Sequence, residues 1–145
     1  MAEQRPQAFE NHVRRDPAFH FFLMPLAFVL FVWAATHAVQ HPRDETIWMA
    51  LMSIVIMCAV FLIRIYSLKV QNRVIRLEER LRLKELLPAS LAHRIGELTG
   101  GQLIALRFAS DAEIPVLVSE ALGKKMSPTD IKKAVTNWRP DYNRV

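Results

Sequence analysis

Apolar and polar residues are divided unevenly along the chain: two long apolar runs come early, and charged residues at helical spacing follow them. Residues 19–39 contain no Asp, Glu, Lys or Arg, over about the 20 residues that cross a 30 Å hydrocarbon layer as a helix. Residues 47–63 are also uncharged and end at Arg64, near the lower limit of about 17 residues. Arg64 and Tyr66 suit the membrane interface, so we predict transmembrane helices at about 19–39 and 47–66.

A short connection, residues 40–46, joins the two runs and predicts a transmembrane hairpin. Pro42 cannot lie inside a continuing helix, and Asp44 and Glu45 suit the positive amino-terminal end of the second helix. Pro25 either starts the regular part of the first helix or kinks it, and the sequence leaves both open. The alternative is a buried hairpin of a soluble protein, which we do not favour because a chain of 145 residues is too short to cover both helices.

The basic residues predict the orientation of the hairpin, because Lys and Arg concentrate on the cytoplasmic side. Arg43 is the only one in the connection. The amino-terminal flank and the segment after the second run are richer: Arg5, Arg14, Arg15, Arg64, Lys69, Arg73, Arg76, Arg80, Arg82 and Lys84. We therefore expect both termini on the cytoplasmic side, with a polar segment at 1–18, the hairpin at 19–66 and a helical domain at 67–145.

The second helix is predicted to leave the membrane without a break, because residues 46–87 contain neither Gly nor Pro and Pro88 follows them. Its outer part has an apolar stripe with the 4-3-4 spacing of a coiled-coil seam, formed by Val70, Val74, Leu77 and Leu81. Glu78 and Arg82 are spaced for an i,i+4 ion pair. Two interpretations stay open: a parallel dimer seam, or a face that the chain's own carboxy-terminal helices cover. The basic residues beside the stripe also suit anionic lipid headgroups.

Recurring helix-start signals from Pro88 onward predict three or four short helices. Ser90, Thr99, Ser110 and Ser127 each begin one, and Gln102 and Glu113 complete capping boxes with Thr99 and Ser110. Gly123 suits a helix end. The predicted core, packed against the long helix, consists of Leu98, Leu103, Leu106, Phe108, Leu117, Leu122, Ile131, Val135 and Trp138.

The last nine residues alternate aromatic, basic and acidic side chains, which makes them candidates for interaction: Trp138, Arg139, Asp141, Tyr142 and Arg144. A ring could stack with Arg139, and Asp141 could pair with Arg144. The segment is then either a docking peptide for a partner or a tail folded back on its own domain.

Chemistry-bearing patterns are missing from the sequence. Cys58 is the only cysteine, so a cysteine zinc site is excluded. His20 and His37 lie about 25 Å apart along one helix, and His37 and His41 could form half of a metal site only if the helix reached His41. The membrane runs carry no acid, and no phosphate-binding loop or nucleophile motif occurs. We expect no enzymatic activity, no catalytic residue and no cofactor or metal.

Three segments, residues 10–22, 69–82 and 137–145, resemble a family of small bacterial two-helix membrane proteins known only as a domain of unknown function. This resemblance implies a bacterial inner-membrane location. It implies no activity, ligand or site residue.

The composition and the patterns together predict an all-α membrane protein in which a transmembrane hairpin continues into a small cytoplasmic helical domain. The best-supported function is a non-enzymatic membrane-anchored scaffold or accessory subunit that binds itself or a larger complex. One alternative is a membrane-tethered nucleic-acid-binding module, suggested by the net charge of +5 and by Lys124, Lys125, Lys132, Lys133 and Arg139. Another is a subunit that packs against a redox or transport complex. Interspersed acidic residues disfavour nucleic acid as a partner.

Overall fold

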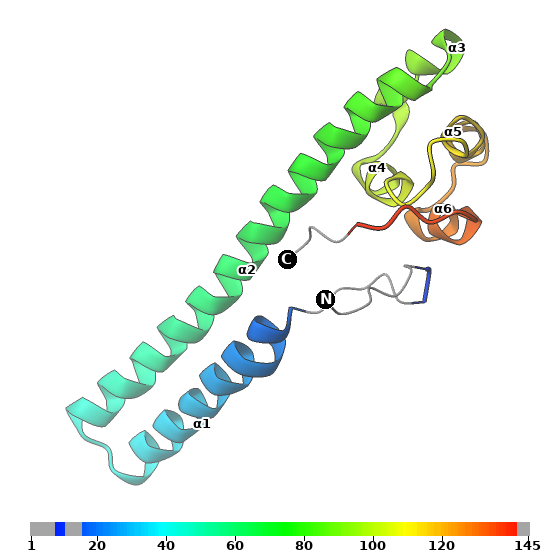
Figure 1. Ribbon diagram of the computed structural model, residues 1–145. Coiled ribbons are helices and arrows are strands. Elements are labelled where there is room, and N and C mark those ends of the chain that lie inside the picture. Colours follow the sequence, from blue (N-terminus) through cyan, green and yellow to red (C-terminus); the bar gives the residue numbers. More distant parts are fainter. Residues whose placement is uncertain (1–7, 11–15, 142–145) are drawn as a thin grey trace. The chain divides into compact units, whose positions relative to one another are not determined.

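The computed structural model describes residues 8–10 and 16–141, and the regular elements in this part of the chain are helices (Figure 1). The only pairing of extended backbone in this part is a single antiparallel bridge between Ala109 and Trp138. The elements in chain order are η1 (Ala18–Leu23, a π-helix), α1 (Met24–Gln40), α2 (Asp44–Leu86), α3 (Ala89–Ala92), η2 (Ile95–Glu97, a 3₁₀-helix), α4 (Gly100–Leu106), α5 (Ile114–Gly123) and α6 (Pro128–Ala134).

The chain divides into two compact units, and the boundary falls inside α2, between Lys69 and Val70. The first unit contains η1, α1 and the amino-terminal part of α2. The second contains the rest of α2, the short helices and the described residues 8–10.

In the first unit, regular α-helix begins at Met24, with Pro25 in the first helical turn. Helical backbone continues from η1 into α1, since Leu23 and Met24 both have right-handed helical angles, so Pro25 removes one N–H donor inside a continuous helical segment. Regular α-helix therefore begins beside Pro25, but the chain is already helical before it, in the π-helical turn of η1.

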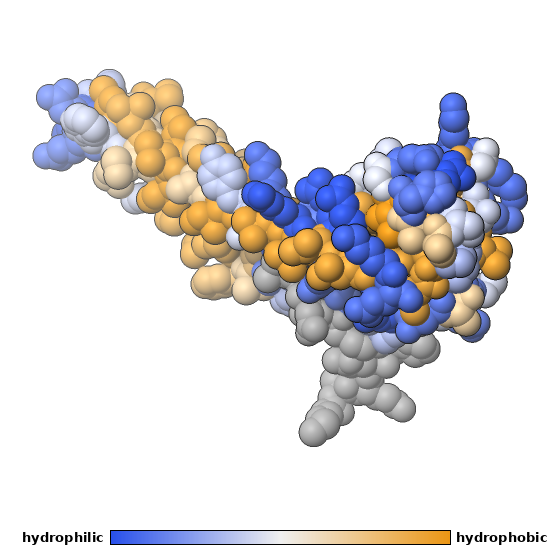
Figure 2. Space-filling view, turned by 90° about the horizontal axis from the view of Figure 1, so that it is seen from above, coloured by the Kyte–Doolittle hydropathy of each residue, from blue (hydrophilic) through white to orange (hydrophobic). Residues whose placement is uncertain are grey.

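Residues 41–43 connect α1 to α2, and Thr46 fastens this connection. The Thr46 hydroxyl donates to the carbonyl oxygen of His41 at 2.7 Å and accepts from the N–H of Arg43 at 3.1 Å. The two helical stretches Ala18–Gln40 (η1 with α1) and Asp44–Leu86 (α2) are long and apolar enough to cross a membrane. Their apolar side chains are largely exposed, and Figure 2 shows apolar residues over much of the surface of this unit.

The second unit has the hydrophobic core, built where α4, α5 and α6 contact one another and α2 adds one face. Leu83 of α2 is fully buried in it, together with residues of the short helices (Leu103, Leu106, Ile114, Val118 and Ile131). Seven of the nine predicted core residues are buried, and Leu122 and Trp138 pack against the core while partly exposed. The predicted core is therefore confirmed.

Helix-start signals are confirmed at two positions and wrong at two, and the helix end expected at Gly123 is observed, one residue before the cap at Lys124. Thr99 and Ser127 form capping boxes with Gln102 and Asp130. Ser90 does not cap a helix, because α3 begins at Ala89 after Pro88. Ser110 forms no cap either, since its hydroxyl donates to Glu113. Gly123 is the last residue of α5, and the left-handed backbone that follows this helix occurs at Lys125 (φ 50°).

Candidate interaction surfaces

The apolar stripe of Val70, Val74, Leu77 and Leu81 lies on the solvent side of α2. Its four side chains are 63%, 48%, 59% and 53% exposed. The interpretation that the chain's own carboxy-terminal helices cover this stripe is therefore wrong for the part of the chain that the structure describes. The four residues form a continuous apolar face that no described residue of the second unit covers.

The short helices pack on the opposite face of α2, which Ile75, Glu79 and Leu83 form at four-residue spacing. All three are buried. With 3.6 residues per turn, the centre of this face lies about 170° around the helix axis from the centre of the stripe. α2 thus has one face that is closed by its own domain and one that is open.

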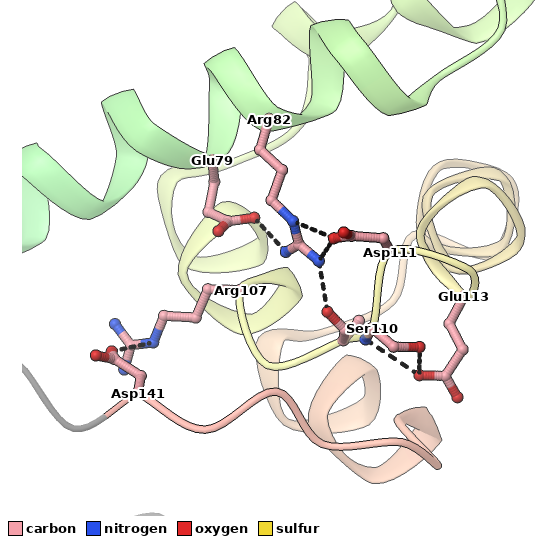
Figure 3. Close-up of polar contacts among 8 residues, drawn as sticks. Glu79, Arg82, Arg107, Ser110, Asp111, Glu113 and Asp141 are labelled. Atoms are coloured by element: carbon pink, nitrogen blue, oxygen red, sulfur yellow. Dashed lines mark hydrogen bonds and ion pairs between the residues drawn. The ribbon is translucent and has the colours of Figure 1, made fainter.

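Arg82 joins α2 to the loop before α5 through a network of polar contacts (Figure 3). Its guanidinium donates to Glu79 Oε2 at 3.1 Å, to Asp111 Oδ1 at 2.6 Å and to the carbonyl oxygen of Ala109 at 2.7 Å. The predicted pair between Glu78 and Arg82 is therefore wrong. Arg82 instead points toward the domain, where three acceptors from two elements converge.

This network places two carboxylates in different environments. Burial raises the pKa of Glu79, and the positive charge of Arg82 only partly offsets that increase. The hydrogen bond from Arg82 lowers the pKa of the exposed Asp111. Glu79 is thus a buried acid whose ionised form Arg82 favours, which suits a structural contact between α2 and the domain.

The carboxy-terminal segment folds back on the domain as far as the structure describes it. Trp138 contacts Phe108 with ring centroids 4.9 Å apart, and the N–H of Arg139 donates to the carbonyl oxygen of Phe108 at 2.7 Å. Asp141 pairs with the buried Arg107 at 3.3 Å (Figure 3). The folded-back interpretation therefore describes this segment up to Asp141. Tyr142 and Arg144, and with them the predicted Asp141–Arg144 pair, lie outside the described residues.

Glu113 holds the start of this segment. Its carboxylate accepts hydrogen bonds from the Thr136 hydroxyl, from the Ser110 hydroxyl at 2.9 Å and from the N–H groups of Thr136 and Asn137 at 3.1 Å and 3.2 Å. Burial raises its pKa, but these hydrogen bonds outweigh burial and lower the pKa to about 2. Sequence reasoning assigned Glu113 only a local cap and missed this contact, because its partners come from 23 and 24 residues away.

Some of the residues considered for metal or nucleic-acid binding have contacts within the chain. Among the described residues no group of three His, Cys, Asp or Glu side chains could hold a metal. The His37 and His41 rings are 5.1 Å apart at the end of α1. Lys124 pairs with Glu120 at 3.0 Å, and the ammonium group of Lys132 lies 5.8 Å from the Phe108 ring.

Comparison with known proteins identifies the family of the chain. A family model matches residues 1–145, and the chain belongs to that family, the family of unknown function DUF6526. No curated protein and no solved structure matches the chain.

Proposed function

We propose that this protein is a non-enzymatic, membrane-anchored scaffold or accessory subunit of a bacterial inner-membrane complex. Its family is one of unknown function, so the proposal rests on the residues of this chain. In this proposal α1 and the first part of α2 form a transmembrane hairpin. The rest of α2 holds the helical domain at the cytoplasmic surface and presents the apolar stripe to a partner. The exposure of the stripe on an otherwise well-packed domain is the observation that carries the proposal.

Membrane anchorage is supported by the exposure of the two apolar helices. In the most apolar 18-residue stretch of each, only 11% and 17% are buried within the chain. A core helix of a soluble protein would be mostly buried, whereas lipid is the natural environment for an apolar surface of this extent.

A hairpin is supported by contacts within the first unit. Arg64 of α2 pairs with Asp16, which lies just before η1, at 3.7 Å. The Arg64 guanidinium also lies over the ring of Phe19, a residue of η1, at 5.2 Å from the ring centroid. Ala27 and Ala34 of α1 and Val60 of α2 are buried, as expected where small side chains let two membrane helices approach. The excess of basic residues on both outer flanks supports cytoplasmic termini, and the sequence resemblance supports a bacterial inner membrane.

The test is a topology and purification experiment on the full-length protein. Single cysteines replacing Arg43 in the connection and Lys125 in the domain, in a Cys58→Ser background, would be labelled with a membrane-impermeant thiol reagent in intact bacterial cells from which the outer membrane has been permeabilised. We expect labelling at position 43 and protection at position 125. Labelling at position 125 would reject the proposed orientation, and release of the protein from membranes by alkaline carbonate would reject the proposed anchorage.

Gentle native purification with mass spectrometry and an absorbance spectrum tests the scaffold role. A defined oligomer or a stoichiometric partner is the expected result. A monomer without any partner would reject a scaffold. Haem or flavin absorbance in a stoichiometric complex would identify a subunit of a redox complex instead, and salt-sensitive retention on DNA would favour the nucleic-acid alternative.

A further inference from the structure

The apolar stripe has the features of one half of a symmetric interface, and we infer that its partner is a second copy of this chain. The two α2 helices pair in parallel and in register as a short two-stranded coiled coil. The inference rests on the proposed membrane anchorage, because two copies inserted with the same topology present α2 in the same direction.

The spacing of the stripe assigns heptad positions to its residues. Val74 and Leu81 occupy position a, and Val70 and Leu77 occupy position d. All four are about half exposed or more. The two residues in the middle of the stripe are Val74 at position a and Leu77 at position d. A β-branched residue at a with Leu at d favours a two-helix coiled coil over one of three or four helices.

The charges beside the stripe select the partner and its direction. Arg73 and Arg80 occupy position g, and Glu78 and Glu85 occupy position e, five residues after each arginine. In a parallel pair, each position g lies beside position e of the next heptad of the partner, so every arginine opposes a glutamate. In an antiparallel pair, g faces g and e faces e, so like charges would oppose one another.

These four charged residues are available for such contacts. All are exposed, and within the part of the chain that the structure describes none of them forms an ion pair. This differs from Arg82, which faces the domain and is engaged by Glu79 and Asp111. The complementary charges are therefore confined to the two borders of the stripe.

The helical domain leaves room for a second copy because it packs on the opposite face of α2, about 170° away around the axis. The seam is short, since position d of the next heptad is Lys84 and Pro88 occupies the following position a. Two heptads associate weakly as free helices. Anchorage in one membrane raises the effective concentration of the two helices and compensates for the short seam.

Two adjacent residues give a matched cross-linking test in native membranes. Val70→Cys and Lys69→Cys would be made separately in the full-length Cys58→Ser protein and treated with a short thiol-to-thiol cross-linker. Both positions are exposed, but only residue 70 lies on the stripe. In the parallel pair the two residues 70 are neighbours, whereas in an antiparallel pair they would be about 16 Å apart along the axis.

We expect a covalent dimer from Val70→Cys at several times the yield from Lys69→Cys. Equal yields would show random collision and overturn the inference. It would also be overturned if residue 70 cross-linked to a different polypeptide or to none. Unchanged melting temperatures of the uncross-linked variants would show that the domain remains folded.

Charge reversal tests the direction and the identity of the partner. The double variants Arg73→Glu/Arg80→Glu and Glu78→Arg/Glu85→Arg each place like charges across a parallel homodimer. We expect the dimer dissociation constant of each in mild detergent to rise roughly 10-fold to 100-fold, and an equimolar mixture of the two to recover dimerisation as a heterodimer. Unchanged self-association of either variant, or no recovery in the mixture, would overturn the inference.

These outcomes separate the inference from the proposed function. If the protein is inserted in the membrane and binds a different stoichiometric partner but does not self-associate, only the inference fails. If it is neither inserted nor associated with anything, both fail.

Discussion

The two faces of α2 beyond Lys69 make up one continuous helix, yet they have different surroundings. The face of Ile75, Glu79 and Leu83 is buried against the helical domain, whereas the stripe of Val70, Val74, Leu77 and Leu81 is exposed. Both faces contain aliphatic residues at helical spacing, so hydrophobicity alone does not distinguish them.

The polar residues are what distinguish the two faces. The buried face has Glu79 in line with its aliphatic residues, and beside it Arg82 is shared between Glu79 and Asp111. The borders of the stripe have arginine on one side and glutamate on the other, without a partner among the described residues. A charge that is satisfied inside the chain marks a closed face, and a complementary pair that is left unsatisfied marks a face suited to a partner.

Truncation of the buried face should have the largest effect. Leu83 is fully buried, so Leu83→Ala should lower the free energy of unfolding of the domain by about 2–5 kcal/mol, through lost burial and the cavity that remains. Hydrogen-exchange mass spectrometry of the full-length protein in detergent measures this as faster exchange of the amides in α4 and α5. Normal protection of these amides in Leu83→Ala would mean that α2 is not part of the core.

Removal of the cation at the edge of the buried face should have the next largest effect. Arg82→Met keeps most of the aliphatic stem but leaves the buried Glu79 without its partner, so we expect a loss of about 2 kcal/mol at neutral pH by the same exchange measurement. Arg80→Met is the matched control at a detergent excess that keeps the protein monomeric, because Arg80 is exposed on the same helix and its proposed partner belongs to a second copy; it should change stability by less than about 0.5 kcal/mol.

The pH dependence of Arg82→Met gives a further check. Burial already raises the folded-state pKa of Glu79, and loss of Arg82 should raise it more. A raised pKa means that the folded state binds the proton more tightly than the unfolded state, so stability falls as pH rises through the folded-state pKa. The defect of Arg82→Met should therefore shrink on acidification. An equal defect at every pH would mean that Glu79 does not cause it.

Glu113 provides a smaller effect with the opposite pH dependence. Its folded-state pKa of about 2 lies below the ordinary value of 4.5, so its ionised form stabilises the fold above about pH 4.5, and this contribution is lost as pH falls toward 2. Glu113→Gln should lower the free energy of unfolding by about 1 kcal/mol at neutral pH. It should also make the melting temperature depend less on pH between these two values. Thermal denaturation followed by circular dichroism tests this, and an unaltered pH profile would contradict it.

The elements that sequence reasoning predicted correctly are those determined by neighbouring residues. The uninterrupted helix expected over 46–87 is observed as Asp44–Leu86, because helix-forming residues continue until Pro88. The capping box of Thr99 and the helix start at Ser127 require only residues within three positions. The leucines of the predicted core follow from the helical spacing of apolar residues along the sequence.

The errors occur where a distant partner competes with a local one. Arg82 was expected to pair with Glu78 but is engaged by Asp111, 29 residues away, and Glu113 was expected to cap α5 but binds Thr136 and Asn137. The same limit applies to the stripe, since periodicity does not reveal which apolar face the domain will cover. The alternation of Arg73, Glu78, Arg80 and Glu85 is a sequence signal that could have favoured the dimer seam beforehand.

Truncation of the exposed stripe should have the smallest effect on the stability of the domain, and it tests the difference between the two faces of α2. Leu77 is 59% exposed, so Leu77→Ala removes few contacts within the chain, and alanine is an even stronger helix former. At a detergent excess that keeps the protein monomeric, the opening free energy obtained from amide exchange in α4 and α5 should change by less than about 0.5 kcal/mol. In membranes, the yield of the dimer cross-linked through residue 70 should decrease. A loss of stability as large as that of Leu83→Ala would instead mean that part of the chain covers the stripe. The two faces would then be equivalent, and the unsatisfied charges beside the stripe would need a different explanation.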